Sequence, residues 1–404
     1  MALLGTPLVV VLACLAALAP VATVLVWSRV RGPQPFRVAS RVGMLVAGQL
    51  ATVLLVAALA NDYGEFYSSW SDLVGSAGGT ASVSTFGSGA AAGRAANPAS
   101  LVPTDRGGPL GTHVRAGRLG RLHVLGVTGW STRSQWPSRG LVESVTIEGV
   151  ASGLAAPAFV YLPPQYFQPA WAHRRFPAVE VLTGYPGSAE SLVNRVDYPR
   201  RALTAVRQHR SAPMVYVLLS STVAPPRDTE CTDVPNGPQV ETFLDRELPS
   251  AVQASLRVRS GDWGIVGDST GGYCAAKIAM THYTVFRAAV SLSGYYDARQ
   301  DVTTGNLWGG SKALRMQNDP ELMLRLYPAP PVSLFVTISK QETGHDGYPD
   351  TRRFLSEVKP PMQVTAMVMS HGGHNFRTWD RELPTALHWL SGRLAQQASP
   401  HTGS

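Results

Sequence analysis

The residues best suited to chemistry lie past the middle of the chain, where an apolar run, Trp263–Val266, leads into Gly267-Asp-Ser269-Thr-Gly271. This is the only Gly-x-Ser-x-Gly in the sequence, and an Ala-rich stretch with helical composition follows it directly. Strand, turn and helix in this order predict a nucleophile elbow, in which glycines make room for a serine on a sharp turn. A serine hydroxyl becomes a nucleophile when a base takes its proton. The alternative interpretation is a glycine-rich turn capped by Ser269.

A base for this serine is expected late in the chain, because elbows of this kind are followed by the acid and then by the histidine. His374 lies between a predicted last strand, 364–369, and a predicted terminal helix, 381–394. Two glycines precede it and allow close approach of the backbone, so we prefer it to His371. No His-Glu-x-x-His motif or cysteine partner supports a metal site at these histidines. A purely structural histidine is the remaining alternative.

The acid that orients the imidazole should follow the penultimate predicted strand, 332–338. The loop there offers Glu342 and Asp346. We take Glu342 as the first choice and Asp346 as the alternative, and the sequence leaves both open.

An oxyanion hole needs backbone N–H groups directed at the charge that develops on a tetrahedral intermediate. One donor is predicted at Thr270, directly after the serine. The second should come from the loop after an early central strand, Thr183-Gly-Tyr185-Pro186-Gly. Since Pro186 has no N–H, Tyr185 is the expected donor.

These residues need a scaffold, and the pattern from about residue 121 onward predicts one. Short β-rich runs are expected at 140–148, 158–162, 177–182, 214–219, 263–266, 288–292, 332–338 and 364–369. Helical stretches lie between most of them, including 240–256, 270–281 and 350–358. This alternation predicts an α/β fold, a mostly parallel central sheet flanked by helices. In such sheets the chemistry lies at the carboxyl ends of the strands.

The composition predicts a membrane anchor in front of this domain. The chain is 45% hydrophobic and only 15% charged, below the usual value of about 25%. Two apolar stretches, 3–27 and 42–60, are long enough to be transmembrane helices. The only charged residues of the first 61 lie between them, Arg29, Arg31, Arg37 and Arg41. The positive-inside rule places that loop in the cytoplasm and all that follows outside the cell membrane. A cleaved signal peptide and a pair of core helices are the alternatives.

The predicted domains are a membrane hairpin at 1–61, a flexible Gly/Ala/Ser-rich linker at 62–120, the α/β domain at 121–396 and a disordered tail at 397–404. Its Gly/Ala/Ser-rich part, from Gly75 to about Gly111, has about 40 residues and therefore a root-mean-square span of about 35 Å. The linker would thus keep the domain close to the membrane surface.

Charge and cysteine content exclude some functions and leave one question open. The net charge is +8, but the basic residues are scattered, which does not favour nucleic-acid binding. Cys14 lies in the first apolar stretch, whereas Cys231 and Cys274 could pair in an oxidising compartment. The pairing and the oligomeric state stay open.

Residues 140–394 resemble the putative-esterase family of α/β-hydrolases, which includes esterase D-like enzymes and secreted mycolyltransferases. Beyond the elbow, the resemblance rests on four stretches: Glu241–Pro249, Asn306–Gly309, Gln317–Pro320, and His374 followed five residues later by Trp379. The resemblance implies that Ser269 and His374 act with a carboxylate, for which Glu342 is the first choice, and without a cofactor. It also implies an ester or acyl-lipid substrate.

One departure separates the chain from the mycolyltransferases. Where these typically carry an Asp and a nearby basic residue for a sugar acceptor, this chain has Thr183 and Pro186. Ester hydrolysis is therefore favoured over transfer to a trehalose-like acceptor. A peptidase, or a non-catalytic binding protein that retains the fold, are the other hypotheses.

Overall fold

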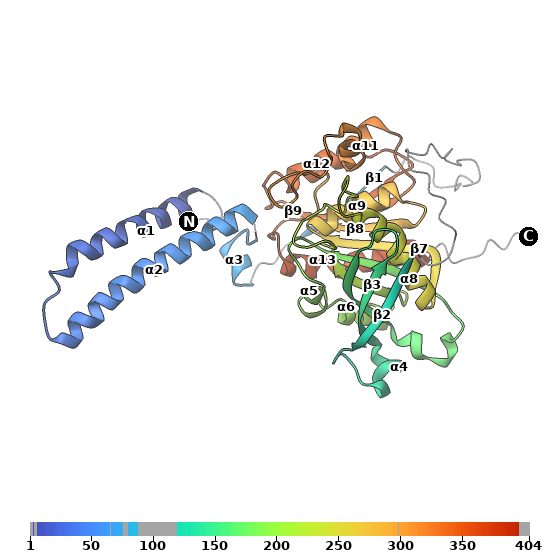
Figure 1. Cartoon of the computed structure of the whole chain (residues 1–404), viewed down its shortest axis with the longest axis horizontal. Coiled ribbons are helices and arrows are strands. Elements are labelled where there is room, and N and C mark those ends of the chain that lie inside the picture. Colours follow the sequence, from blue (N-terminus) through green and yellow to red (C-terminus); the bar gives the residue numbers. More distant parts are fainter. Residues whose placement is uncertain are drawn as a thin grey trace, which may run out of the picture.

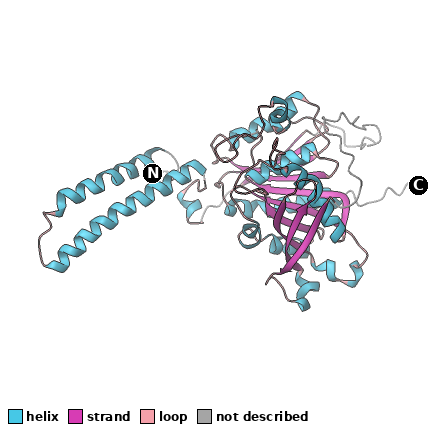
Figure 2. Cartoon of the chain, in the orientation of Figure 1, coloured by secondary structure: helices cyan, strands magenta, loops and turns pink. Residues whose placement is uncertain are grey.

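The computed structural model of the chain describes residue 3 and residues 6–64, 66–75, 80–87, 119–297 and 299–395. A long helical hairpin projects from one side of a larger domain in which helices surround a sheet (Figures 1 and 2). The predicted tail at 397–404 lies outside the described residues.

The hairpin consists of α1 (Thr6–Trp27) and α2 (Gln34–Gly64), which run side by side in Figure 1. Both are long and apolar enough to cross a membrane, over Thr6–Trp27 and Gln34–Asp62. The second helix begins earlier than predicted, so Arg37 and Arg41 lie in α2 rather than in a loop. Its first turn contains Pro35, whose fixed φ is already helical. Arg41 donates from Nη2 to the carbonyl of Trp27, 3.2 Å away, at the turn of the hairpin.

The prediction of one continuous linker at 62–120 is wrong for two described segments. Residues Trp70–Leu73 form the short helix α3, and Ala81–Phe86 form strand β1 at an edge of the sheet. Strand β1 pairs antiparallel with β10 (Gln363–Met369), from Ala81 opposite Met369 to Phe86 opposite Val364. Its sequence, ASVSTF, contains β-branched and aromatic residues that suit a strand despite the low-complexity surroundings. Most of the remaining predicted linker, residues 88–118, lies outside the described residues.

Over the described residues, the sheet has ten strands in the order β1-β10-β9-β8-β7-β5-β6-β4-β3-β2. The six from β10 to β6 run parallel to their neighbours, whereas β4, β3 and β2 pair antiparallel at one edge and β1 at the other. The remaining strands are β2 (Gly120–Val127), β3 (Leu141–Gly149), β4 (Ala155–Leu162), β5 (Phe176–Thr183), β6 (Val215–Ser220), β7 (Val258–Asp268), β8 (Phe286–Leu292) and β9 (Ser333–Ser339).

Helices cover both faces of the sheet, as Figure 2 shows. One apolar core includes α8 (Leu248–Ser255), α9 (Thr270–Thr281) and α12 (Tyr348–Glu357). The other includes α5 (Ala189–Asn194), α6 (Tyr198–Arg207) and α13 (Phe376–Ala395). Shorter helical segments are α4 (Trp136–Arg139), α7 (Val240–Thr242), α10 (Lys312–Gln317), α11 (Pro320–Leu326), and the turns at Arg133–Gln135, Pro164–Phe167, Pro169–Trp171 and Phe243–Glu247. The predicted α/β fold, a mostly parallel sheet flanked by helices, is confirmed.

The direction of the parallel strands determines where the loops of a site can meet. Because β5, β7, β8, β9 and β10 share one direction, the loops that follow them meet at one edge of the sheet. Those loops contain every residue that the sequence marked as a candidate for the site.

Candidate active site

Ser269 occupies a strained turn between β7 and α9. Its φ of 54° and ψ of −124° lie in a region that side chains rarely adopt, as a nucleophile elbow requires. The flanking glycines make the turn possible. A Cβ on Gly267 would lie 2.0 Å from the carbonyl oxygen of Gly271, and one on Gly271 would lie 2.2 Å from that of Leu182. The strain is therefore built into the local sequence.

His374 reaches the serine from the loop after β10. Its Nε2 lies 2.8 Å from Ser269 Oγ, and its Nδ1 lies 2.8 Å from Glu342 Oε2. The ring of Trp379 stands edge-on to the imidazole with 5.2 Å between centroids. With Nδ1–H donating to the glutamate, Nε2 carries the lone pair that accepts the serine hydroxyl proton.

Glu342 is enclosed at the end of β9 and is only 2% exposed. Its Oε1 accepts hydrogen bonds from the Ser293 hydroxyl and from the Ser339 N–H, both at 3.0 Å. The second oxygen is left for His374. A buried carboxylate with donors on both oxygens can hold an imidazole in one orientation and stabilise its charged form.

The two alternative residues lie elsewhere. Asp346 pairs with Arg299 at the surface and lies 3.1 Å from His345 Nδ1. His371 is exposed, and its Nδ1 lies 2.9 Å from the Ser370 hydroxyl. The structure thus brings together Ser269, His374 and Glu342, and it does not bring Asp346 or His371 into that group.

The predicted oxyanion donors lie on both sides of the serine. Thr270 is the first residue of α9, so its N–H has no acceptor within the helix. The loop after β5 approaches the serine so closely that a Cβ on Gly184 would lie 2.6 Å from Ser269 Cβ. Tyr185 follows Gly184, and its hydroxyl donates to the carbonyl of Pro226 at 3.3 Å.

Asp268, directly before the serine, connects the elbow to this loop. Its Oδ2 accepts from the Gly184 N–H at 3.1 Å and from the Thr183 hydroxyl at 3.4 Å. The side chain is buried, and this burial raises the pKa of the carboxyl to about 7. Asp268 therefore sets the position of the backbone next to Tyr185.

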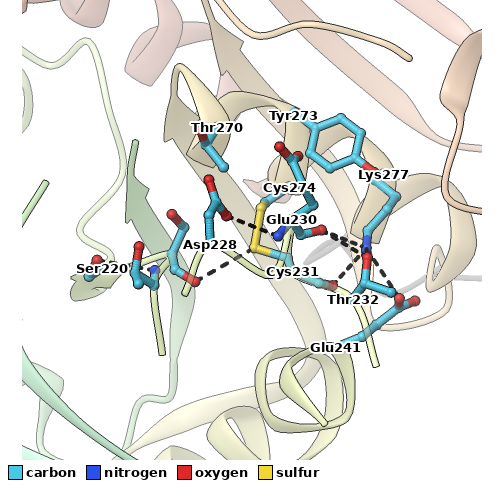
Figure 3. The surroundings of a disulfide bond; sticks show 12 residues. Ser220, Asp228, Glu230, Cys231, Thr232, Glu241, Thr270, Tyr273, Cys274 and Lys277 are labelled. Carbon is cyan, nitrogen blue, oxygen red and sulfur yellow. Dashed lines mark hydrogen bonds and ion pairs between the residues drawn. A yellow bond between two sulfur atoms is a disulfide. The ribbon is translucent and has the colours of Figure 1, made fainter. Parts of the chain in front are cut away.

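A segment between β6 and α7 is fastened to α9 behind the elbow (Figure 3). A disulfide joins Cys231 to Cys274, which answers the question that the sequence left open. The fully buried Lys277 donates to the Cys231 carbonyl at 2.6 Å and to Asn318 Oδ1 at 2.7 Å, and it pairs with Glu241 at 3.2 Å. These bonds hold α9 and hence the serine turn in place.

Two further buried carboxyls lie near the site. Glu230 accepts at 2.6 Å from the hydroxyl of Tyr295, which also lies 3.3 Å from the Thr270 hydroxyl. Glu382 of α13 accepts from the Thr337 hydroxyl at 2.6 Å. Burial raises the pKa of both groups, that of Glu382 to about 8.

Sequence reasoning missed the residues that support the site rather than form it. Asp268 and Lys277 each gave a signal, an acid inside the serine motif and a lone lysine in an apolar helix. Ser293 and Ser339 gave none, because a serine at the end of a strand is common.

A strained serine turn at the carboxyl end of a central parallel strand is the architecture of the α/β-hydrolases. The S-formylglutathione hydrolase from Agrobacterium tumefaciens superposes on this chain with a TM-score of 0.56 at 16% identity, covering 67% of this chain and all of the other. The serine hydrolase FphF from Staphylococcus aureus gives 0.50 at 18% identity, covering 63% and 99%. At such identities the likeness establishes the fold.

The sequence model of the family described as "Putative esterase" matches residues 153–390, more than half of the chain. The chain belongs to this family. The uncharacterized protein Cgl0967/cg1104 from Corynebacterium glutamicum is 22% identical over 258 residues, covering 61% of this chain. The match spans 60% of that relative's length.

Proposed function

We propose that the protein is a membrane-anchored serine esterase or acyltransferase whose catalytic domain lies outside the cell membrane. The observation that carries the proposal is the pair of 2.8 Å distances that connect Ser269 Oγ, His374 and Glu342. Membership of an esterase family supports carboxylic esters as the substrate class.

In the proposed mechanism, Ser269 Oγ attacks the ester carbonyl while His374 Nε2 takes its proton. Glu342 holds the imidazole through Nδ1 and stabilises its positive charge. The oxyanion accepts from the N–H groups of Thr270 and Tyr185. His374 then protonates the departing alcohol, which leaves an acyl group on Ser269. Water or a second alcohol attacks this acyl-enzyme, with His374 acting first as base and then as acid.

Hydrolysis and transfer differ only in the acceptor that resolves the acyl-enzyme. Thr183, which stands where mycolyltransferases carry an acceptor-binding Asp, is buried and donates its hydroxyl to Asp268. It is not available to an acceptor alcohol. This contact favours water as the acceptor and hydrolysis as the principal reaction.

The membrane part of the proposal rests on the two apolar helices and the arginines at their turn. In this topology, residues 1–61 anchor the chain, and the α/β domain at 121–396 lies outside the membrane together with β1 and α3. The Cys231–Cys274 disulfide supports an oxidising compartment.

Fluorophosphonate labelling of the full-length chain in membranes tests the catalytic proposal. We expect the wild type to be labelled and the Ser269→Ala variant to remain unlabelled, because only an activated serine reacts. Equal labelling of both chains, or of neither, would contradict a serine enzyme.

An alkaline phosphatase fused after Ser404 tests the topology, since this reporter is active only outside the membrane. An inactive but intact fusion would overturn the proposed orientation.

A further inference from the structure

The segment that follows the hairpin lies directly against the loops of the candidate site. The Ser68 hydroxyl donates to Gln341 Oε1 at 2.7 Å, and Gln341 is the neighbour of Glu342. Asn375, the neighbour of His374, donates from Nδ2 to Asp72 Oδ2 at 3.3 Å and also to the carbonyl of Phe66. The chain leaving α2 thus contacts the residues next to both the acid and the base.

These contacts form a built interface. Asp72 is fully buried, and its Oδ2 also accepts from the Ser68 N–H at 3.1 Å. Ser69 caps α3 by accepting from the Asp72 N–H at 3.2 Å. Arg377 donates to the backbone carbonyl oxygen of Asp72. Because several donors and acceptors match, residues 66–75 have a defined position on the domain.

The same segment is fastened to the end of the apolar helix. Asn61 accepts from the Tyr67 N–H at 2.8 Å and donates to the Tyr67 carbonyl at 3.1 Å. Asn61 follows directly on the apolar stretch that ends at Ala60. Seven residues lead from Asn61 to Ser68, a fully extended reach of at most about 25 Å. The site loops therefore lie closer to the end of the span than a free linker of about 35 Å would place them.

The outer side of this segment is apolar. Phe66, Trp70, Leu73 and Val74 are exposed, Trp70 by 50% and Val74 by 74%. Trp and Tyr side chains are enriched where a transmembrane protein meets the membrane–water interface. In Figure 1, α3 lies between the end of α2 and the α/β domain.

We propose that residues 66–75, which we call the membrane collar, rest on the outer lipid surface and hold the loops of the site next to it. The occupant of the apolar side is the bilayer, because the collar continues the span with only Asn61–Glu65 between them. Esters embedded in that surface then reach Ser269 without crossing water. This inference rests on the proposed function, since it needs both the anchor and the serine nucleophile.

Fluorescence quenching tests the position of the collar independently of activity. Val74→Cys, in a Cys14→Ala chain, carries an environment-sensitive dye, and the full-length protein is reconstituted in phosphatidylcholine/phosphatidylglycerol vesicles. Nitroxide on the lipid headgroups should quench this dye strongly. The matched reference is Leu326→Cys, 52% exposed at the end of α11. Leu326 lies far from the site because its neighbour Arg325 pairs with Glu357, the last residue of α12. The chain enters β10 from there, at the edge of the sheet opposite to the site. Equal quenching at both positions, or none at residue 74, would overturn the inference and would indicate a protein occupant or a free surface.

Two esters that share one leaving group test whether the membrane collar favours substrates that lie in the lipid. Methylumbelliferyl oleate partitions into the vesicle, whereas the butyrate stays in water. Trp70→Glu places a charge in the lipid contact and should lower oleate turnover by about tenfold while butyrate turnover stays within about twofold. Tyr327→Glu, at a residue that is 51% exposed, should change neither rate.

The outcomes separate the two proposals. If Trp70→Glu affects both esters equally or neither, or if only the butyrate is hydrolysed by the wild type, the collar proposal fails and the serine enzyme stands. If fluorophosphonate labels no serine in the wild type, the proposed function itself fails. Labelling of the Trp70→Glu variant at the wild-type level shows that the variant is folded.

Discussion

The loop after β9 and the middle of β5 each bury a glutamate, but their surroundings are opposite. Glu342 accepts from the Ser293 hydroxyl and the Ser339 N–H and faces His374. Glu180 is 0% exposed, and within the part of the chain that the structure describes neither of its carboxyl oxygens has a hydrogen-bond partner. Burial, then the charge of Asp245, raises the pKa of Glu180 well above its usual range.

The difference follows from where each residue lies in the sheet. In mid-strand, the backbone N–H groups are used by the ladder, so a side chain there finds few free donors. At the carboxyl end, loop N–H groups and hydroxyls are available. Asp268 with two donors and Glu382 with one are intermediate cases. These buried carboxyls therefore differ in the number of hydrogen-bond donors that they have, from the most at Glu342 to the fewest at Glu180.

The largest expected effect comes from removing the charge of the best supported acid. Glu342→Gln should lower kcat by about 10⁴, the size found when a triad acid becomes an amide. The reason is that the imidazole loses the group that selects its tautomer and stabilises its charge. Initial rates on a methylumbelliferyl ester measure the effect. Glu180→Gln is the matched control and should stay within about twofold, since it does not contact the site. A similar loss in both variants would refute the distinction between the two glutamates.

Asp268 should show a smaller effect that depends on its acceptor oxygen. Asp268→Ala removes the acceptor for the Gly184 N–H, so we expect kcat to fall by about 10-fold to 100-fold, less than the loss of a donor itself. Asp268→Asn keeps an acceptor and should restore most of the rate. Steady-state kinetics with fluorophosphonate labelling as a folding check measure both. If the Asn variant is as slow as the Ala variant, the positioning role is wrong.

Glu180 is expected to lower the free energy of unfolding and to have no role in catalysis. Replacing it with the similarly long, apolar Met removes an unpaired buried polar group and should stabilise the fold by about 1–3 kcal/mol near neutral pH. The gain should shrink in acid but not vanish. The unpaired neutral carboxyl costs stability at every pH, whereas the raised pKa adds a further penalty only at pH values where the unfolded carboxyl ionises. Denaturant unfolding of the detergent-solubilised chain measures it. The control is Glu148→Met, at a partly exposed residue that pairs with His123, with a change of less than about 1 kcal/mol expected. A destabilised Glu180→Met variant with unchanged m-value would argue for an unrecognised partner.

The raised pKa of Glu382 defines a pH range over which the stability of the fold should change. The folded pKa of Glu382 is about 8 against an ordinary value of 4.5, so the folded state binds more protons between these values and loses stability as pH rises through that range. Glu382→Gln keeps an acceptor for Thr337 but cannot ionise. Its melting temperature should therefore match the wild type below about pH 4.5, exceed it increasingly up to about pH 8, and then stay ahead by a constant margin. A difference in melting temperature that does not change with pH would contradict the assigned pKa.

The fold and the centre of the site could be predicted because local chemistry determines them. The elbow needs glycines at 267 and 271 for steric reasons, and their clash distances explain why the motif is visible in sequence. Alternation of strands and helices predicts a parallel sheet whose loops converge. The grouping of Ser269 and His374 with an acid from the loop after β9 follows from this order, whereas the choice of Glu342 over Asp346 does not. The catalytic roles of these residues stay predictions.

Other features depend on contacts between distant segments and left no local pattern. Asp268 contacts Gly184 across 84 positions, and Asn375 contacts Asp72 across 303. Strand β1 was hidden because its composition resembles the surrounding low-complexity sequence. The docking of residues 66–75 could not be foreseen, since hydrogen bonds between polar side chains carry no periodicity.

Replacing Asp346 is expected to have the smallest effect on activity. It extends the comparison of the two buried glutamates to a carboxylate at the surface. Sequence alone could not separate Asp346 from Glu342, because both lie in one short loop after β9. In the structure, the Glu342 N–H donates to the Ser339 carbonyl at 3.1 Å, which turns the glutamate inward, while Asp346 lies at the surface beside Arg299. Asp346→Asn should therefore keep kcat/KM within about twofold, as surface charges away from a site usually do. Ester hydrolysis across neutral pH measures this. A loss comparable to that of Glu342→Gln would mean that the loop rearranges during turnover and that the aspartate, not the buried glutamate, supports the histidine.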